Sequence, residues 1–225
     1  MGIYVNPGNA AFEMSRFSSI YVDKSMLITK LNAVYKTDRR FVCVSRPRRF
    51  GKSMAASMLC AYYSCGCNSA SLFSGLKAET DKSFQRHLNQ HCVIRLDMQQ
   101  FLESRHDLDT FIGKIESRVT SELKALFPDY TDAWPDIRLK ECLGQIFSQT
   151  KKGFVFIIDE WDCVFRVARQ RKDIQKDYLD FLRGLFKGQD YVELAYMTGI
   201  LPIKKYGEHS AINDFDEYSM ISPKN

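Results

Sequence analysis

The feature that most constrains the fold is a continuous apolar run, Phe41-Val42-Cys43-Val44, that ends in a polar, turn-forming segment. A short apolar run without alternation is typical of a parallel strand that is covered on both faces. After the polar segment, helical spacing relates Met54, Met58, Ala61 and Tyr62. The sequence therefore predicts a strand–loop–helix unit. Such a unit points a helix N-terminus, with its free N–H groups and the positive end of its dipole, at an anion.

The polar segment, residues 46–53, matches half of the phosphate-binding motif G-x-x-x-x-G-K-[ST]. Gly51, Lys52 and Ser53 supply the second half, whereas Arg46 stands where the first Gly is expected. In a loop of this kind the Lys reaches the β- and γ-phosphates of ATP, and the Ser or Thr hydroxyl binds Mg²⁺. We therefore expect Lys52 to contact the nucleotide and Ser53 to contact the metal ion.

The missing first Gly implies a loop of a different shape, because Pro47 fixes one φ angle. The guanidinium groups of Arg46, Arg48 and Arg49 either pair with phosphate or face solvent, and the sequence leaves both possibilities open. The residues expected to bind the nucleotide are Arg46, Pro47, Arg48, Arg49, Phe50, Gly51, Lys52, Ser53 and Met54.

A second motif lies further along the chain, where the apolar run 154–158 ends in Asp159 and Glu160. Two carboxylates at the end of a buried strand cost free energy unless they have partners. In ATPases with a phosphate-binding loop, the first acid holds the Mg²⁺ shell and the second polarises the attacking water. We therefore assign Asp159, with Ser53, to the metal and Glu160 to the water. The alternative is a strand end with two solvated acids.

Strand and helix patterns alternate over the rest of the chain. Further strands are predicted at 92–97 and 192–197, and amphipathic helices at 26–34, 108–126, 139–147 and 174–185. This alternation predicts an α/β fold with a mainly parallel sheet. From Ile203 on, no clear periodic element is predicted.

Thr198 ends the last predicted strand, and a polar residue there can sense the γ-phosphate, since ligands bind at the carboxyl ends of parallel strands. Thr198 therefore joins Lys52 and Glu160 as a candidate catalytic residue. The alternative is a strand-terminating Thr without a ligand. Asp97 also ends a strand and is a secondary candidate.

Composition narrows the class of protein. The 225 residues are 45% hydrophobic and 26% charged, which are ordinary globular values. The net charge of +5 is too small to indicate a nucleic-acid partner by itself. No apolar run approaches the ~20 residues of a membrane span, and no secretory signal is visible. The seven scattered cysteines favour a reduced, cytoplasmic protein.

At these motifs the chain resembles the AAA-ATPase-like proteins of bacteria, which pair an ATPase domain with a downstream PD-(D/E)xK nuclease-like domain. That family's loop carries Arg in place of the first Gly, whereas Trp161 stands where the family usually has Tyr. The resemblance implies a P-loop NTPase three-layer sandwich of the ASCE/AAA type. It rests on four segments: Ile20-Tyr21-Val22-Asp23-Lys24, residues 45–53, Ile158-Asp159-Glu160-Trp161-Asp162, and residues 197–203.

Members of that family continue into a helical lid and then into the nuclease-like domain. This chain stops at Asn225, and nothing in it supplies a second acid–acid–Lys site. We therefore expect a C-terminally truncated ATPase module without lid, nuclease-like domain or nuclease activity. Residues 1–35 are expected to be an N-terminal segment that packs on the ATPase core, and residues 36–225 to be the ATPase domain.

The sequence favours an ATP-binding domain with slow, Mg²⁺-dependent ATP hydrolysis that is coupled to a conformational switch. One alternative is a nucleotide-dependent binding module with little turnover, because the lid is missing and no arginine finger can be assigned with certainty. Arg166, Arg169 and Arg171 could serve a neighbouring protein in trans, but a solvated helix face is the preferred interpretation. The other alternative, a nucleic-acid-associated protein, leaves Asp159 and Glu160 unexplained. A protein partner or self-association stays open.

Overall fold

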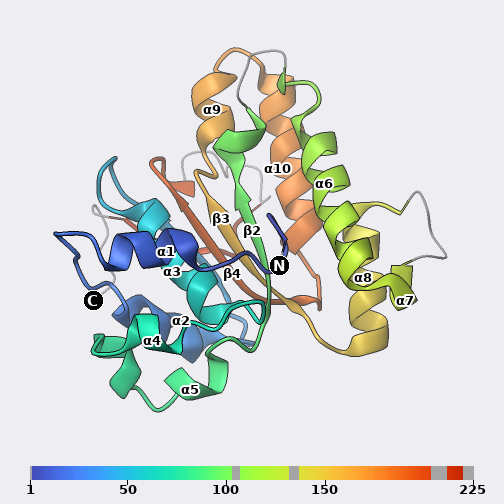
Figure 1. Ribbon diagram of the computed structural model, residues 1–225. Helices are drawn as coiled ribbons and strands as arrows, with labels where there is room; N and C mark the ends of the chain where they lie inside the picture. Colours follow the sequence, from blue (N-terminus) through green and yellow to red (C-terminus); the bar gives the residue numbers. More distant parts are fainter. Residues whose placement is uncertain (1, 103–106, 132–136, 204–211, 220–225) are drawn as a thin grey trace.

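The computed structural model describes residues 2–102, 107–131, 137–203 and 212–219 (Figure 1). Its centre is a sheet in which every neighbouring pair of strands is parallel, with the order β2-β3-β4-β1-β5. The strands are β1 (Phe41–Ser45), β2 (Cys92–Asp97), β3 (Phe154–Asp159), β4 (Val192–Gly199) and β5 (Asp216–Tyr218). The predicted α/β class with a parallel sheet is confirmed.

The sheet is covered on both faces, which is why its central strands are apolar at nearly every position. All six residues of β3 are buried. Because side chains alternate along a strand, Phe154, Phe156 and Ile158 enter one core cluster, while Val155 and Ile157 enter the other. The molecule is therefore a three-layer sandwich.

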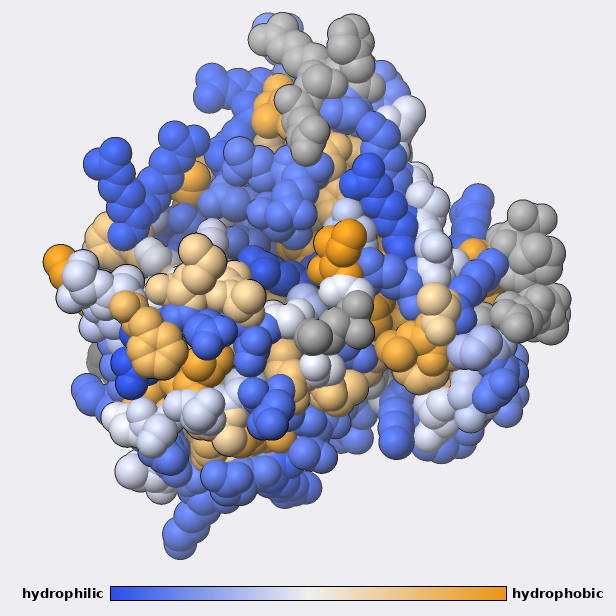
Figure 2. All heavy atoms as spheres, in the orientation of Figure 1, coloured by the Kyte–Doolittle hydropathy of each residue, from blue (hydrophilic) through white to orange (hydrophobic). Residues whose placement is uncertain are grey.

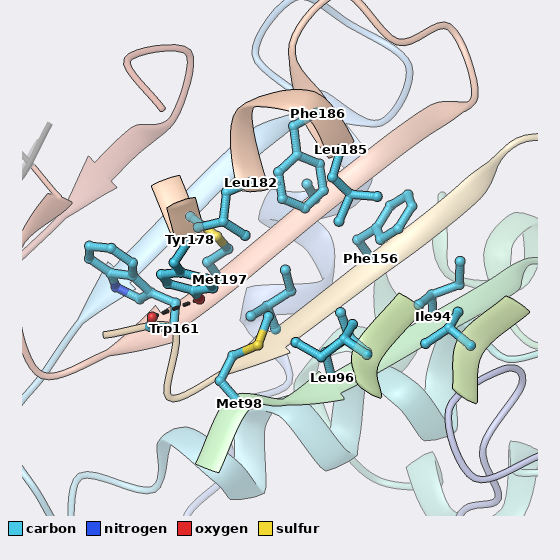
Figure 3. Close-up of a cluster of buried hydrophobic side chains, with 14 of the residues drawn as sticks. Ile94, Leu96, Met98, Phe156, Trp161, Tyr178, Leu182, Leu185, Phe186 and Met197 are labelled. Atoms are coloured by element: carbon cyan, nitrogen blue, oxygen red, sulfur yellow. Dashed lines mark hydrogen bonds between the residues drawn. The ribbon is translucent and has the colours of Figure 1, made fainter. Parts of the chain in front are cut away.

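Five helices contribute to or border the first face, on the right and at the top of Figure 1. In Figure 3, Phe156 and Met197 of the sheet point towards Leu182, Leu185 and Phe186 of α10. These helices are α6 (Phe111–Leu126), α7 (Pro128–Thr131), α8 (Leu139–Thr150), α9 (Cys163–Val167) and α10 (Lys172–Phe186).

The other face is covered by the first half of the chain (Figure 1). Ten of the twelve residues of α3 are buried, because this helix lies between the sheet and the other helices of its layer. The elements of this layer are α1 (Ala10–Arg16), α2 (Met26–Val34), α3 (Lys52–Tyr63), α4 (Ala70–Phe73), η1 (Lys77–Thr80) and α5 (Phe84–His87). A further 3-10 turn, η2 (Met98–Phe101), follows β2.

The predicted strands and helices are present, with bounds that differ by a few residues. The expectation that no element follows Ile203 is wrong, because β5 pairs with β1 at the sheet edge. Its three residues are only half-buried and mostly polar, so they carry no apolar pattern. At the opposite edge, Val5 forms an antiparallel bridge with Ile94 of β2.

The surface is mixed rather than uniformly polar. Figure 2 shows hydrophilic side chains over the helices at the top of the molecule and a hydrophobic group over α1. None of the described helices has both the length and the apolar character to cross a bilayer.

Candidate functional site

The predicted phosphate-binding loop connects the end of β1 to the start of α3. The Arg46 N–H donates to the carbonyl of Gly199 at 3.0 Å, which fastens the start of the loop to the end of β4. Gly51 precedes α3 with a φ of 69°, a left-handed conformation that glycine adopts at low cost. Arg49 is also left-handed, with a φ of 68°. The loop is therefore tightly wound just before the helix.

The backbone N–H groups of residues 48–53 donate to no acceptor within the part of the chain that the structure describes. They lie at and before the N-terminus of α3, where the helix dipole adds positive potential. Successive free N–H groups at such a place can bind an anion.

Lys52, the first residue of α3, is buried despite its charge. Its Nζ donates to the carbonyl of Pro47 at 3.3 Å and lies 3.8 Å from Oε1 of Glu160. The loop and the end of β3, more than a hundred residues apart in sequence, thus meet at the ammonium group of Lys52.

Asp159 is the last residue of β3 and is 1% exposed. Burial and the charge of Asp97 raise the pKa of its carboxyl, against hydrogen bonds from Ser53 and from the Glu160 N–H. Glu160 follows in a left-handed conformation, with a φ of 52°, which turns the chain sharply away from the strand. The structure therefore brings Ser53, Asp159 and Glu160 together beside Lys52.

Asp97 lies directly opposite Asp159 in the register of β2 and β3. Burial and the nearby Glu160 raise its pKa, although the Gln99 N–H and Arg95 act in the opposite direction. Carboxylates that are held together and disfavour their charged form are suited to a hard divalent cation. Among the described residues, no cluster of three or more His, Cys, Asp or Glu could hold a metal by itself.

The remaining loop residues differ in exposure. Arg46 is half-buried, and its Nη1 donates to the carbonyls of Ser45 and Tyr218 at 3.0 and 3.2 Å. Met54 is half-buried on α3. The exposed residues of the loop are Pro47, Arg48, Arg49, Phe50 and Ser53.

Thr198 lies near the end of β4 and is fully buried. Its hydroxyl donates to the carbonyl of Val44 on β1 at 3.1 Å, and its carbonyl accepts the N–H of Trp161 at 3.1 Å. Thr198 thus connects the strand before the loop to the turn after β3, and a sensing role for it stays a prediction.

Sequence reasoning missed the role of Arg166, for which a solvated helix face was the preferred interpretation. That interpretation is wrong: Arg166 is paired with Glu160, and its Nε lies 3.2 Å from Oδ2 of Asp162. The i,i+4 spacing of Asp162 and Arg166 is the sequence signal that could have indicated this pair. In contrast, Arg169 is exposed, and Arg171 pairs on the surface with Asp109 and Asp173.

Asp162 is a second residue that sequence reasoning did not assign. It is fully buried, and its carboxylate accepts the N–H groups of Ile200 and Leu201 at 3.2 and 3.1 Å. A Cβ on Gly199 would lie 2.5 Å from Oδ1 of Asp162, so glycine permits this close approach. Asp162 therefore fixes the chain after β4 against the turn after β3.

A parallel α/β sandwich with a lysine-bearing loop before a buried helix, and with acids at the end of a neighbouring strand, has the architecture of a P-loop NTPase. The family model described as "AAA-ATPase_like: Predicted AAA-ATPase" matches residues 10–207. The chain belongs to this family of predicted AAA-ATPases, and this membership indicates nucleotide binding.

A curated relative is also similar to this chain. It is an uncharacterized protein in the vnfD 5' region of Azotobacter chroococcum mcd 1, 28% identical over 207 residues. The match covers 90% of this chain but 38% of the relative, so the chain spans less than half of the relative's length.

Proposed function

We propose that this chain binds Mg-ATP at the loop of residues 46–53 and hydrolyses it slowly, with the hydrolysis coupled to a conformational switch. The observation that carries the proposal is the position of Lys52, whose ammonium group lies between the loop carbonyl of Pro47 and the carboxylate of Glu160. A cation held there, beside free N–H groups, suits the phosphates of a nucleotide.

The roles follow from the positions of the side chains. Lys52 binds the β- and γ-phosphates, and Ser53 and Asp159 hold Mg²⁺, which neutralises phosphate charge when it is bound. Glu160 orients the water that attacks the γ-phosphorus and accepts its proton, as the bond to the ADP oxygen breaks. Thr198, behind the loop, is the proposed sensor of the γ-phosphate. The seven free cysteines suit a reducing cytoplasm.

A second candidate is a nucleotide-dependent switch with little turnover, and the contacts of Glu160 favour it. Both carboxylate oxygens of Glu160 face cations, one facing Lys52 and the other paired with Arg166. A base that is paired in this way has to be released before it can act on water. Whether nucleotide binding alone releases Glu160 from Arg166 is what separates the two candidates.

The test uses three variants of the protein. Lys52→Ala should weaken Mg-ATP binding sharply, because it removes the cation that faces the phosphates. Glu160→Gln should leave the affinity near wild type and lower turnover by roughly 10²–10⁴-fold, the effect of losing a general base. Asp159→Asn should weaken the dependence of binding on Mg²⁺. Titration calorimetry measures the affinity for Mg-ATP, and a phosphate-release assay measures the turnover.

Two exposed residues provide matched controls: Lys82→Ala and Glu13→Gln remove the same charges far from the loop in sequence and should change neither quantity. Unchanged affinity in folded Lys52→Ala would rule out the nucleotide site. If wild-type turnover is no faster than that of Glu160→Gln, the chain is the switch and the hydrolase proposal fails.

A further inference from the structure

The segment Ile20-Tyr21-Val22-Asp23-Lys24 has no role in the proposed function, yet it reaches the phosphate-binding loop. Nζ of Lys24 donates to the carbonyl of Phe50. A Cβ built on Gly51 would lie 2.6 Å from the same Nζ. The ammonium group of Lys24 therefore packs directly against the loop backbone, in the space that Gly51 leaves open.

The residues on both sides of Lys24 are bonded to η1 through their side chains. The Asp23 carboxylate accepts the N–H groups of Ser25 and Lys77 at 2.8 and 3.0 Å. The hydroxyl of the fully buried Ser25 accepts the N–H of Ala78 at 3.0 Å. These hydrogen bonds fix the position of Lys24 relative to η1 and so hold its side chain at the loop.

The charges near Lys24 indicate that the loop favours the binding of an anion. Partial burial and the positive charge of Arg46 both lower the pKa of Lys24. In the described residues, neither side chain is paired with a carboxylate, and carbonyl oxygens are the acceptors for both. Two cations held close together without an acid favour a bound anion beside them.

The geometry of the peptide bond links Lys24 to the nucleotide site. The described chain contains no cis peptide bond, so the Phe50 carbonyl and the Gly51 N–H point in opposite directions. Because Lys24 holds the carbonyl on its own side, it directs the Gly51 N–H to the other side of this peptide. That N–H is one of the free donors of the loop.

We propose that Lys24 is a positioning residue of the nucleotide site: it fixes the Phe50–Gly51 peptide so that the Gly51 N–H faces the phosphates. The inference rests on the proposed nucleotide binding and deepens it. It also assigns the segment 20–24 a structural role, which is to hold Lys24 against the phosphate-binding loop. Asp23 and Ser25 secure the backbone, and Lys24 pre-organises the loop before the nucleotide arrives, which lowers the cost of binding.

The experiment compares Lys24→Met with wild type, because Met keeps the length of the side chain and removes the charged donor. We expect the dissociation constants of Mg-ATP and ADP to rise about tenfold or more, the effect of losing a hydrogen bond to a charged group. In steady-state assays KM should rise while kcat at saturating ATP stays near wild type, since Lys24 does not contact the reacting atoms. The melting temperature of the nucleotide-free protein should stay unchanged.

The controls separate this inference from the proposed function. Lys82→Met removes an exposed lysine and should bind nucleotide like wild type. If Lys52→Ala loses binding while Lys24→Met binds like wild type, the site stands and the positioning role is overturned. A lower melting temperature together with the loss of affinity would show a merely structural role and also overturn it. A wild-type protein that binds no nucleotide overturns both proposals.

Discussion

At the scale of single residues, the site depends on charges that are buried with defined partners. Lys52, Asp159 and Asp162 are each less than a tenth exposed. A charge in such surroundings is tolerated only where hydrogen bonds or opposite charges compensate the loss of water. Arg166 supplies part of that compensation, because it contacts both Glu160 and Asp162. Arg166 thus stabilises the turn after β3 and also holds the Glu160 carboxylate in an ion pair.

Asp162→Ala should therefore destabilise the fold by about 2 kcal/mol, because it leaves two backbone N–H groups without their acceptor and removes a carboxylate that faces Arg166. The matched control is Asp180→Ala, which removes an exposed carboxylate 3.0 Å from Arg183. A surface pair of this kind contributes little, so the control should stay within about 0.5 kcal/mol of wild type. Urea denaturation at pH 7 measures both, and equal midpoints for the two variants would contradict this account of Asp162.

At the scale of elements, the sequence predicts β1 to β4 because strands covered on both faces must be apolar at nearly every position. The edge strand β5 escapes prediction, because Asp216 and Glu217 are only half-buried. The loop and the acids of the candidate site follow from contiguous motifs. The contacts of Arg166 and Lys24 do not follow in this way. They depend on how the left-handed Glu160 turns the chain and on how η1 holds the segment 20–24.

At the other end of the sheet, a polar network joins Tyr35 just after α2, His87 of α5, His91 just before β2 and Glu193 of β4. Nδ1 of His87 lies 3.0 Å from Nε2 of His91, and Tyr35 bonds both His91 and Glu193. Burial, His91 and Arg86 lower the pKa of His87 to about 4, although Glu193 acts in the opposite direction. Burial alone would raise the pKa of Glu193, but hydrogen bonds from its neighbours lower it to about 2.

This network predicts loss of stability in acid. Between pH 6.5 and about 4, the unfolded chain binds a proton at His87 that the folded protein does not, so stability falls as the pH falls through this window. Glu193 adds a further loss from about pH 4.5 down to about 2, where its folded carboxylate takes up a proton. His87→Gln should therefore flatten the change in urea midpoint between pH 7 and pH 5. The same slope in the variant and in wild type would contradict the assignment to His87.

At the scale of the whole molecule, the fold brings together four segments that lie far apart in the chain: the segment 20–24, the loop after β1, the turn after β3 and the end of β4. For the last three segments the cause is the parallel pairing of the strands, because it places the carboxyl ends of β1, β3 and β4 at the same end of the sheet. The segment 20–24 is held there by hydrogen bonds to η1. In sheets of this type, ligands bind at the carboxyl ends of the strands. The same architecture brings Lys24 to the loop that carries Arg46 and Lys52, and three positive charges at one place would favour the proposed nucleotide phosphates.

The last prediction concerns nucleic acid. The net charge of +5 is small, and two of the arginines that a DNA-binding surface could use, Arg39 and Arg40, have partners in the fold. Arg39 is paired with Asp216 at 2.8 Å, and the guanidinium of Arg40 lies 4.7 Å from the ring centre of Phe41. We therefore expect DNA binding weaker than about 1 µM at physiological salt, in the range of non-specific binding. Fluorescence anisotropy with a short duplex at two salt concentrations measures this. Nanomolar affinity with a steep salt dependence, unaffected by excess Mg-ATP, would show a separate DNA site and revive the nucleic-acid interpretation.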